Sequence, residues 1–298
     1  MWVILAISSS FLLGIYDLLK KSSLKNNAFV PVLFFATFTG AIIFSALLLF
    51  SRSSIIIEGS IFYVPEISVK EHLLYFFKSA IVGTSWYFAY MALSRLPITI
   101  VVPIRSTGPV WTVAGAFLLY GERFNLFQWL GITLSVIATY LFALAGRKEG
   151  ISFLRNKWVY AIFIATIFGS ASSLFDKYLL ASYNRMAVQA WFSIYMVVVM
   201  LPFLLLMWFP RRKLQPAFQW RWTIPAIGIV LSLADFLYFY ALSEPGALIG
   251  IVSVFRRGSV MFSFTVGAII FKEGNLRSKS IGLIGILLGA ILLVIGST

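Results

Sequence analysis

Ten apolar runs, each about as long as an α-helix that crosses a bilayer, fill almost the whole chain. A helix rises 1.5 Å per residue, so ~20 residues span about 30 Å of hydrocarbon. The runs are 2–20, 30–50, 72–93, 97–120, 125–146, 158–181, 187–209, 222–243, 246–271 and 279–296. Because 60% of the 298 residues are hydrophobic and only 11% are charged, a soluble domain is excluded. The sequence predicts an all-α polytopic membrane protein with ten transmembrane helices.

The second half of the chain repeats the pattern of the first. Asp17 in the first run has a counterpart in Asp176 of the sixth, and the aromatic stretch 87–90 of the third run has one in 236–240 of the eighth. Because five helices are an odd number, the second half must enter the membrane from the opposite side, as in many transporters. We therefore predict two inverted five-helix repeats. They occupy residues 1–146 and 158–298, joined by a linker at 147–157.

Arginine lies inside two of the apolar runs, where a charge is costly and usually functional. Arg105 is eight residues past Pro97, and Arg256 is ten residues past Gly246. At 1.5 Å per residue, they lie about 12 Å and 15 Å into their helices. A guanidinium group suits carboxylates of either origin. Two hypotheses stay open: each arginine binds the anionic group of a substrate, or each forms an internal ion pair.

Acidic residues that could pair with Arg256 occur in two of the later runs. Asp176 lies near the end of the sixth run and Asp235 thirteen residues into the eighth, both toward the end at which the ninth run begins. With Arg256 and Arg257 they could form one polar network. Asp235 has apolar neighbours along the chain, so its carboxyl group could take up and release a proton during transport.

Two other charges are expected to be structural. Asp17 lies one turn from Lys20 and Lys21, and we expect these lysines to pair with it at the water interface. Lys78 lies six residues into the third run. Its long side chain is expected to snorkel to the membrane surface.

Aromatic side chains lie at equivalent positions of the third and eighth runs. Most aromatic residues of such a chain contact lipid or pack in the core. Their placement on repeat-related helices nevertheless favours a role in lining a pocket. We select Trp86, Tyr90 and Tyr238 as substrate-binding candidates.

Composition excludes several classes of function. The chain has no cysteine and a single histidine, so disulfides, thiol nucleophiles and zinc sites are not expected. The sequence has no Gly-x-x-x-x-Gly-Lys-Ser/Thr stretch, so it is not expected to hydrolyse ATP. The net charge of +14 is typical of basic loops beside a membrane rather than of a nucleic-acid partner. We predict no enzymatic activity, cofactor or metal.

The segments that join the last helices of each half resemble a known family. Gly121-Glu122-Arg123 is followed by Gln128-Trp129-Leu130-Gly131, and Lys272-Glu273-Gly274 is followed by Ile281-Gly282. These motifs, with the two five-helix halves, resemble the drug/metabolite transporter superfamily and its EamA family in particular. The resemblance implies a basket of helices 1, 3, 4, 6, 8 and 9 around a central cavity, with helices 5 and 10 packed together. It also implies export or exchange of small metabolites.

Helix 10 carries a face of small residues formed by Gly285 and Gly289. Such a face lets two helix backbones approach closely. We expect it to pack within the monomer rather than to form a dimer seam.

The sequence therefore predicts a secondary transporter, an exporter or exchanger of small polar or amphipathic metabolites such as amino acids, that works by alternating access. It is expected in the plasma (inner) membrane as a monomer or homodimer in contact with lipid. One alternative is an exchanger of nucleotide sugars or phosphorylated metabolites, in which Arg105, Arg256 and Arg257 clamp phosphate. Another is an intramembrane enzyme that uses Asp176 with Asp235.

The sequence leaves the orientation of the chain open. Lysine and arginine gather in the loops at the end where Lys20 lies, and the positive-inside rule puts that end in the cytoplasm with both termini outside. The family resemblance implies the opposite, with both termini in the cytoplasm.

Overall fold

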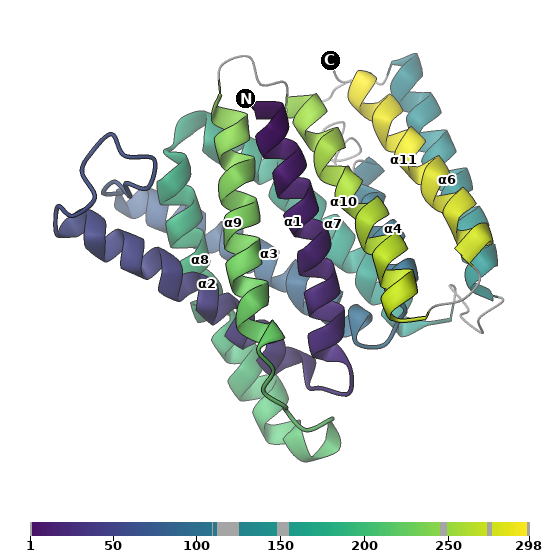
Figure 1. Cartoon of the computed structure of the whole chain (residues 1–298), viewed down its shortest axis with the longest axis horizontal. Coiled ribbons are helices and arrows are strands. Elements are labelled where there is room, and N and C mark those ends of the chain that lie inside the picture. Colours follow the sequence, from purple (N-terminus) through teal and green to yellow (C-terminus); the bar gives the residue numbers. More distant parts are fainter. Residues whose placement is uncertain are drawn as a thin grey trace.

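The computed structural model describes residues 2–108, 110–111, 125–147, 155–244, 249–272 and 276–296, and all regular structure in these ranges is helical (Figure 1). The helices are α1 (Trp2–Leu24), α2 (Phe29–Arg52), α3 (Val69–Leu93), α4 (Ile98–Ser106), α6 (Leu126–Arg147), α7 (Lys157–Ser182), α8 (Arg185–Pro202), α9 (Thr223–Ser243), α10 (Ile249–Ile270) and α11 (Leu276–Ile295). Each lies on one of the predicted apolar runs. Within the described part of the chain, the all-α class and the order of the spans are confirmed.

Polar residues fix where several helices begin. Ser68 starts α3 with a capping box, in which its hydroxyl accepts from the Glu71 backbone N–H and the Glu71 carboxylate accepts from the Ser68 backbone N–H at 2.8 Å. Burial raises the pKa of Glu71, but the hydrogen bonds from Ser68 outweigh this effect, and the pKa is lowered. Asn156 and Asn184 cap α7 and α8 through their side-chain oxygens.

The predicted run 187–209 is not one regular α-helix, because α8 ends at Pro202. After Pro202 the chain continues as a π-helical segment at Phe203–Trp208 and a 3-10 segment at Phe209–Leu214. Proline has no backbone N–H, so it interrupts the regular hydrogen-bond pattern of an α-helix. The three basic residues that follow Pro210 therefore lie beyond the apolar part of the helix.

The packing of the helices repeats between the two halves. Helix α1 packs along α9 and α10, and its counterpart α7 packs along α3 and α4. Helix α2 packs on α8 and α9, and α8 in turn packs on α3. These pairings are what two inverted copies of one five-helix unit produce when they face each other. In Figure 1, α1 starts and α11 ends at the same end of the molecule.

Helices α6 and α11 lie side by side at one edge of the molecule (Figure 1), as expected for helices 5 and 10. A Cβ atom at Gly285 would come within 2.7 Å of the Ala138 Cβ, and one at Gly289 would meet the Ser135 side chain and the Gly131 carbonyl. The glycine face therefore packs within the chain, which confirms that prediction.

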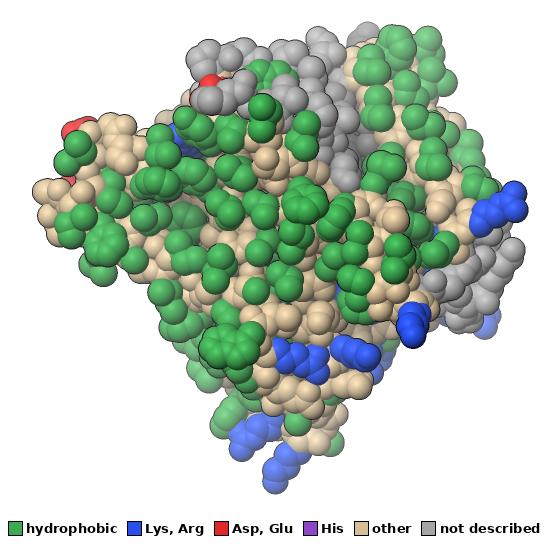
Figure 2. Space-filling model, viewed as in Figure 1, with side chains coloured by type: hydrophobic (Ala, Val, Ile, Leu, Met, Phe, Trp, Pro, Cys, Tyr) green, Lys and Arg blue, Asp and Glu red, His purple; other side chains and the backbone are tan. Residues whose placement is uncertain are grey.

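The outer surface suits a lipid environment. Among the described residues, four helical segments are long and apolar enough to span a bilayer: Phe29–Arg52, Lys157–Ser182, Arg185–Leu214 and Thr223–Ala241. Figure 2 shows hydrophobic side chains over most of the visible face, with lysine and arginine gathered toward the end where α1 stops. Lys25, Arg211, Arg212 and Lys213 are exposed. This distribution matches the apolar belt and basic loops of a membrane protein.

Candidate functional site

A pocket opens between α2 and α3 of the first repeat and α8 and α9 of the second. It holds about 420 Å³ of space free of protein atoms, its open mouth included. The lining residues are Ala36, Thr37 and Gly40 from α2, Trp86 and Tyr90 from α3, Gln189, Phe192, Ser193 and Met196 from α8, and Ile227, Gly228, Leu231, Ser232 and Asp235 from α9. Since α2 corresponds to α8 and α3 to α9, the pocket lies where the two repeats meet.

Glycine lets α2 and α9 cross closely beside this pocket. A Cβ atom at Gly228 would overlap the Ala36 carbonyl oxygen and come within 2.8 Å of the Thr39 Cβ. The neighbouring backbone cannot yield as a flexible side chain could. Any larger residue at Gly228 therefore has to push α2 and α9 apart.

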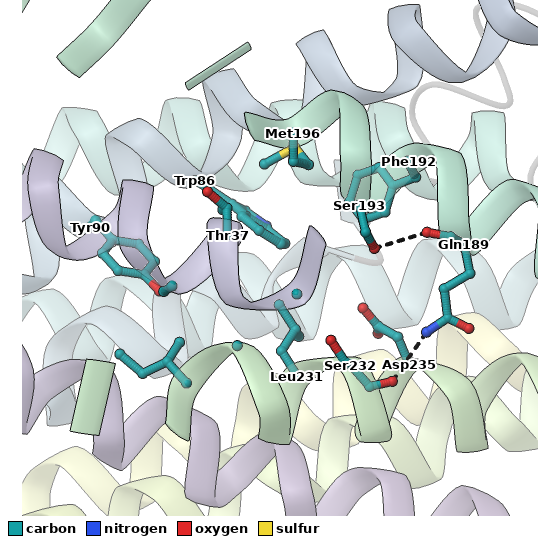
Figure 3. A pocket seen from close by; sticks show the side chains of 14 residues that line it. Thr37, Trp86, Tyr90, Gln189, Phe192, Ser193, Met196, Leu231, Ser232 and Asp235 are labelled. Carbon is teal, nitrogen blue, oxygen red and sulfur yellow. Dashed lines mark hydrogen bonds between the residues drawn. The ribbon is translucent and has the colours of Figure 1, made fainter. Parts of the chain in front are cut away.

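Polar side chains gather at one end of the pocket. Figure 3 shows Gln189 and Ser193 from α8 opposite Ser232 and Asp235 from α9. The Gln189 side-chain amide donates to the Ser232 backbone carbonyl at 3.1 Å, and the Ser193 hydroxyl donates to the Gln189 backbone carbonyl at 2.8 Å. Gln189 is only 2% exposed, and its side-chain oxygen has no hydrogen-bond partner among the described residues. Asp235 also interacts with another residue of the chain.

Aromatic side chains form the other end. Trp86 and Tyr90 lie there in Figure 3, with Thr37 beside Trp86. The Trp86 ring meets the Phe192 ring edge-on at 6.1 Å between centroids. The pocket therefore offers a polar end and an aromatic end to one bound molecule.

A buried ion pair lies behind Tyr90. The Lys20 ammonium is 2.6 Å from the Asp17 carboxylate and 4.0 Å and 5.7 Å from the centroids of the Tyr16 and Tyr90 rings. Ser263 of α10 donates to the other Asp17 oxygen at 3.3 Å. The predicted pairing of Asp17 with Lys20 is confirmed.

The predicted location of that pair at the water interface is wrong, because Lys20 is only 2% exposed. Helices α3 and α10 cover the pair, through Tyr90 and Ser263. Lys21 does not provide the second partner that was expected. Its ammonium donates to the Leu93 carbonyl at 3.1 Å and also to the Leu96 carbonyl, at the end of α3.

A second buried ion pair lies behind Phe192. The Lys78 ammonium of α3 is 2.5 Å from the Asp176 carboxylate of α7. It also lies 4.7 Å and 5.3 Å from the centroids of the Phe192 and Phe239 rings. The prediction that Lys78 snorkels to the surface is wrong. Helix α3 begins at Val69, so Lys78 is about 14 Å into the helix, and a carboxylate is within reach.

The acids of the two ion pairs are related by the internal repeat, whereas Lys20 lies on α1 and Lys78 on α3, which are not repeat counterparts. Asp17 and Asp176 occupy matching positions on α1 and α7, the first helices of the two halves. Lys20 lies about 27 Å along α1, whereas Lys78 lies in the first half of α3, which runs in the same direction. One pair is therefore nearer to one end of the molecule and the other nearer to the opposite end. Both acids had been selected from the sequence, but the pairing of Asp176 with Lys78 differs from the predicted network with Asp235 and the arginines.

The other selected residues are placed as follows. Arg105 lies in the last turn of α4, half-buried, and its charge acts on Tyr16, Lys20 and Tyr90, but it is not among the lining residues. Tyr238 packs near Ala6 and Ala241, between α1 and α9, and is not among the lining residues either. The side chains of Arg256 and Arg257 on α10 lie outside the described residues, as do Glu122 and Glu273.

The pocket differs from the basket of helices implied by resemblance. Helices α2 and α8, the second and seventh spans, supply half of its walls. Sequence reasoning missed Gln189 and Ser193 of α8 and Ser232 of α9, which line the pocket. The available signal was Gln189, an amide inside the apolar run 187–209.

The comparisons with known proteins agree with this architecture. The model of the EamA-like transporter family matches the chain in two stretches, residues 1–144 and 156–295. No curated protein matches the chain. A solved crystal structure superposes with a TM-score of 0.60 and 14% identity, covering 98% of this chain and 98% of that one. At this identity the likeness shows the fold alone.

Proposed function

Because the chain belongs to the EamA-like transporter family, we propose that this multi-pass membrane protein is a secondary transporter that moves small polar or amphipathic metabolites by alternating access. Family membership gives a transporter of the drug/metabolite type. The substrate class and the mechanism are our proposal. The observation that carries it is the pocket where the two repeats meet. One buried ion pair lies behind Tyr90 of its wall and another behind Phe192.

In this mechanism the two ion pairs act as closures at opposite ends. Asp17 and Lys20 of α1 contact α3 and α10 through Tyr90 and Ser263, so they close the end where α1 stops. Lys78 and Asp176 join α3 to α7 nearer the other end. Opening either end would require water to reach the corresponding pair, since an unpaired charge inside the protein is strongly unfavourable. Rocking of the repeats would expose the pairs in turn.

Asp235 is our candidate for coupling to a proton gradient. It is the sole charged side chain among the described residues that line the pocket. A carboxyl group at a binding site can hold a proton in one state and release it in another. Arg105, Arg256, Tyr90, Trp86 and Tyr238 stay candidates for substrate contacts, of which Trp86 and Tyr90 have the best support because they line the pocket.

The alternatives receive less support from the described residues. An exchanger of phosphorylated metabolites needs cations in the pocket, and the charge found on its described lining is an acid. An intramembrane enzyme needs Asp176 and Asp235 in one wet site, but Asp176 pairs with Lys78 and does not belong to the described lining.

We propose the plasma (inner) membrane as the location, with the basic end of the molecule in the cytoplasm. The repeats are taken as 1–146 and 158–298 with a linker at 147–157. The chain is proposed to act as a monomer or homodimer. The glycine face of α11 gives no support to a dimer, because α6 already covers it.

Reconstitution tests the proposal directly. The purified chain in liposomes, preloaded with one unlabelled compound at a time, should accumulate the same labelled compound by counterflow for at least one member of a panel. The panel holds amines, amino acids, organic acids and sugar phosphates, and empty liposomes set the background. Folded protein that accelerates no compound would count against the transport function.

A further inference from the structure

We propose that the polar end of the pocket binds a protonated amine, so that the transported molecule is an amphipathic cation with an apolar or aromatic body. This inference rests on the proposed function, because it assigns the substrate class of the same pocket. It comes from the kinds of hydrogen-bonding groups that the pocket presents and from the sign of its charge.

The described groups at the polar end mostly accept hydrogen bonds. The Gln189 side-chain oxygen is buried and has no hydrogen-bond partner among the described residues, while the amide nitrogen of the same side chain donates to the Ser232 backbone carbonyl. The Ser193 hydroxyl donates to the Gln189 backbone carbonyl, so the lone pairs of the hydroxyl oxygen are left to accept a hydrogen bond from a ligand. A ligand that supplies donors would satisfy the Gln189 and Asp235 side-chain oxygens, whereas a ligand that only accepts would find the Ser232 hydroxyl as a donor at this end.

Asp235 sets the charge of the ligand. It is the sole charged side chain among the described lining residues, and Figure 3 shows it on the same side of the pocket as Ser232. A carboxylate has about four acceptor positions, so its interaction with another part of the chain leaves room for a further donor. An ammonium group carries three donors and a positive charge, and hydrogen bonds between ionised groups are the stronger kind.

The aromatic end fits the rest of such a molecule. Trp86 and Tyr90 would contact the apolar body of the ligand, and Phe192 and Met196 extend this apolar surface along α8. Two of these rings already interact with cations, since Lys20 lies over Tyr90 and Lys78 over Phe192. Both lysines are paired with their own aspartates, so their charges are largely compensated and do not oppose a cationic ligand.

Three probes of one shape separate the possibilities. They are 2-phenylethylamine, which is cationic at neutral pH, 2-phenylethanol, which is neutral, and 3-phenylpropionate, which is anionic. Equilibrium binding to the purified full chain is measured by competition against radiolabelled 2-phenylethylamine. We expect saturable binding of the amine, displacement by excess amine, and at least tenfold weaker displacement by the alcohol and the acid. Binding of the acid or the alcohol as tightly as the amine, or no saturable amine binding, would overturn the inference without need of any variant.

A variant then assigns the charge to one residue. Asp235→Asn keeps the shape of the side chain, removes the charge, and should weaken amine binding by roughly tenfold to a hundredfold, the range for a hydrogen bond between ionised groups. Glu58→Gln, a matched change at an exposed loop position, should leave it unchanged. Equal amine affinity of both variants and the wild type would contradict the role of Asp235.

Flux measurements keep this inference distinct from the proposed function. If counterflow occurs for organic acids or sugar phosphates and not for amines, the chain is a transporter and the amine inference is wrong. If labelled 2-phenylethylamine binds in an Asp235-dependent manner and no compound of the panel moves, the amine site stands and the transport function fails.

Discussion

Removing the charge of Lys78 should destabilise the protein by breaking the ion pair with Asp176. In the Lys78→Met variant the hydrophobic stem keeps its contacts with Phe192 and Phe239, but the Asp176 carboxylate loses the ammonium at 2.5 Å. Breaking a buried pair in this way costs roughly 3–5 kcal/mol. The Asp176 side chain is 24% exposed, so water can partly solvate its charge. We therefore expect a loss at the lower end of this range. A loss of about 3 kcal/mol should lower the Tm by roughly 6–10 °C.

A double variant distinguishes an orphaned charge from a simple loss of packing. Lys78→Met combined with Asp176→Leu replaces the pair by two apolar side chains, which is often nearly neutral for buried pairs. We therefore expect the double variant to be more stable than Lys78→Met alone. Thermal unfolding of purified protein gives both values, and Lys25→Met at an exposed loop position serves as the control. Unfolding of Lys78→Met at the same temperature as Lys25→Met, or a double variant no more stable than Lys78→Met alone, would contradict the buried ion pair.

Three further changes test other parts of the structure. Gly228→Ala places a Cβ atom against the Ala36 carbonyl, so it should lower the free energy of unfolding by about 1–3 kcal/mol in a denaturation assay; wild-type stability would show that α2 and α9 cross less closely. Folding lowers the pKa of Glu71 below its value in the unfolded chain, about 4.3. The ionised Glu71 of the capping box therefore stabilises the fold at pH values above about 4.3, and this contribution is lost as the pH falls through the lower pKa of the folded state. Glu71→Gln should therefore flatten the dependence of Tm on acid pH, and an unchanged profile would contradict the assignment. Asp235→Asn should abolish the effect of an imposed proton gradient on flux in liposomes; flux that still follows the gradient would exclude this carboxyl group as the coupling site.

The fold could be predicted well because membrane spans depend on length and hydropathy along the chain. The ten apolar runs, the repeat marked by Asp17 and Asp176, and the packing of Gly285 and Gly289 within the chain all follow from local pattern. Burial of backbone polar groups in lipid permits little besides helices, so apolar segments of this length have few alternatives.

The surroundings of single charges were harder to predict, because they depend on neighbours from distant parts of the sequence. Lys78 was expected at the membrane surface, but α3 starts three residues earlier than predicted and α7 brings Asp176 beside it. Lys20 was expected in water and is instead covered by α3 and α10. Long side chains reach either water or a partner from the same helix position, and only the packing decides between them.

The candidate pocket was predicted in part for the same reason. Trp86 and Tyr90 were selected from their place on repeat-related helices, and Asp235 was selected as an acid among apolar neighbours. All three belong to the lining. Gln189 was not selected, because hydropathy treats a single amide in an apolar run as a tolerated exception. Its importance depends on the facing helix α9, whose Ser232 carbonyl holds its amide nitrogen.

Protection of one introduced thiol by the transported compound tests the central claim that the substrate occupies this pocket. The chain has no cysteine, so Thr37→Cys gives a single reactive site in the lining, and Glu58→Cys gives a matched site on an exposed loop. The measurement is the rate of reaction with a maleimide with and without saturating 2-phenylethylamine. The amine should slow labelling of the Thr37→Cys variant severalfold and leave that of the Glu58→Cys variant unchanged. Equal rates for the Thr37→Cys variant with and without saturating amine would place the substrate elsewhere and contradict the central claim.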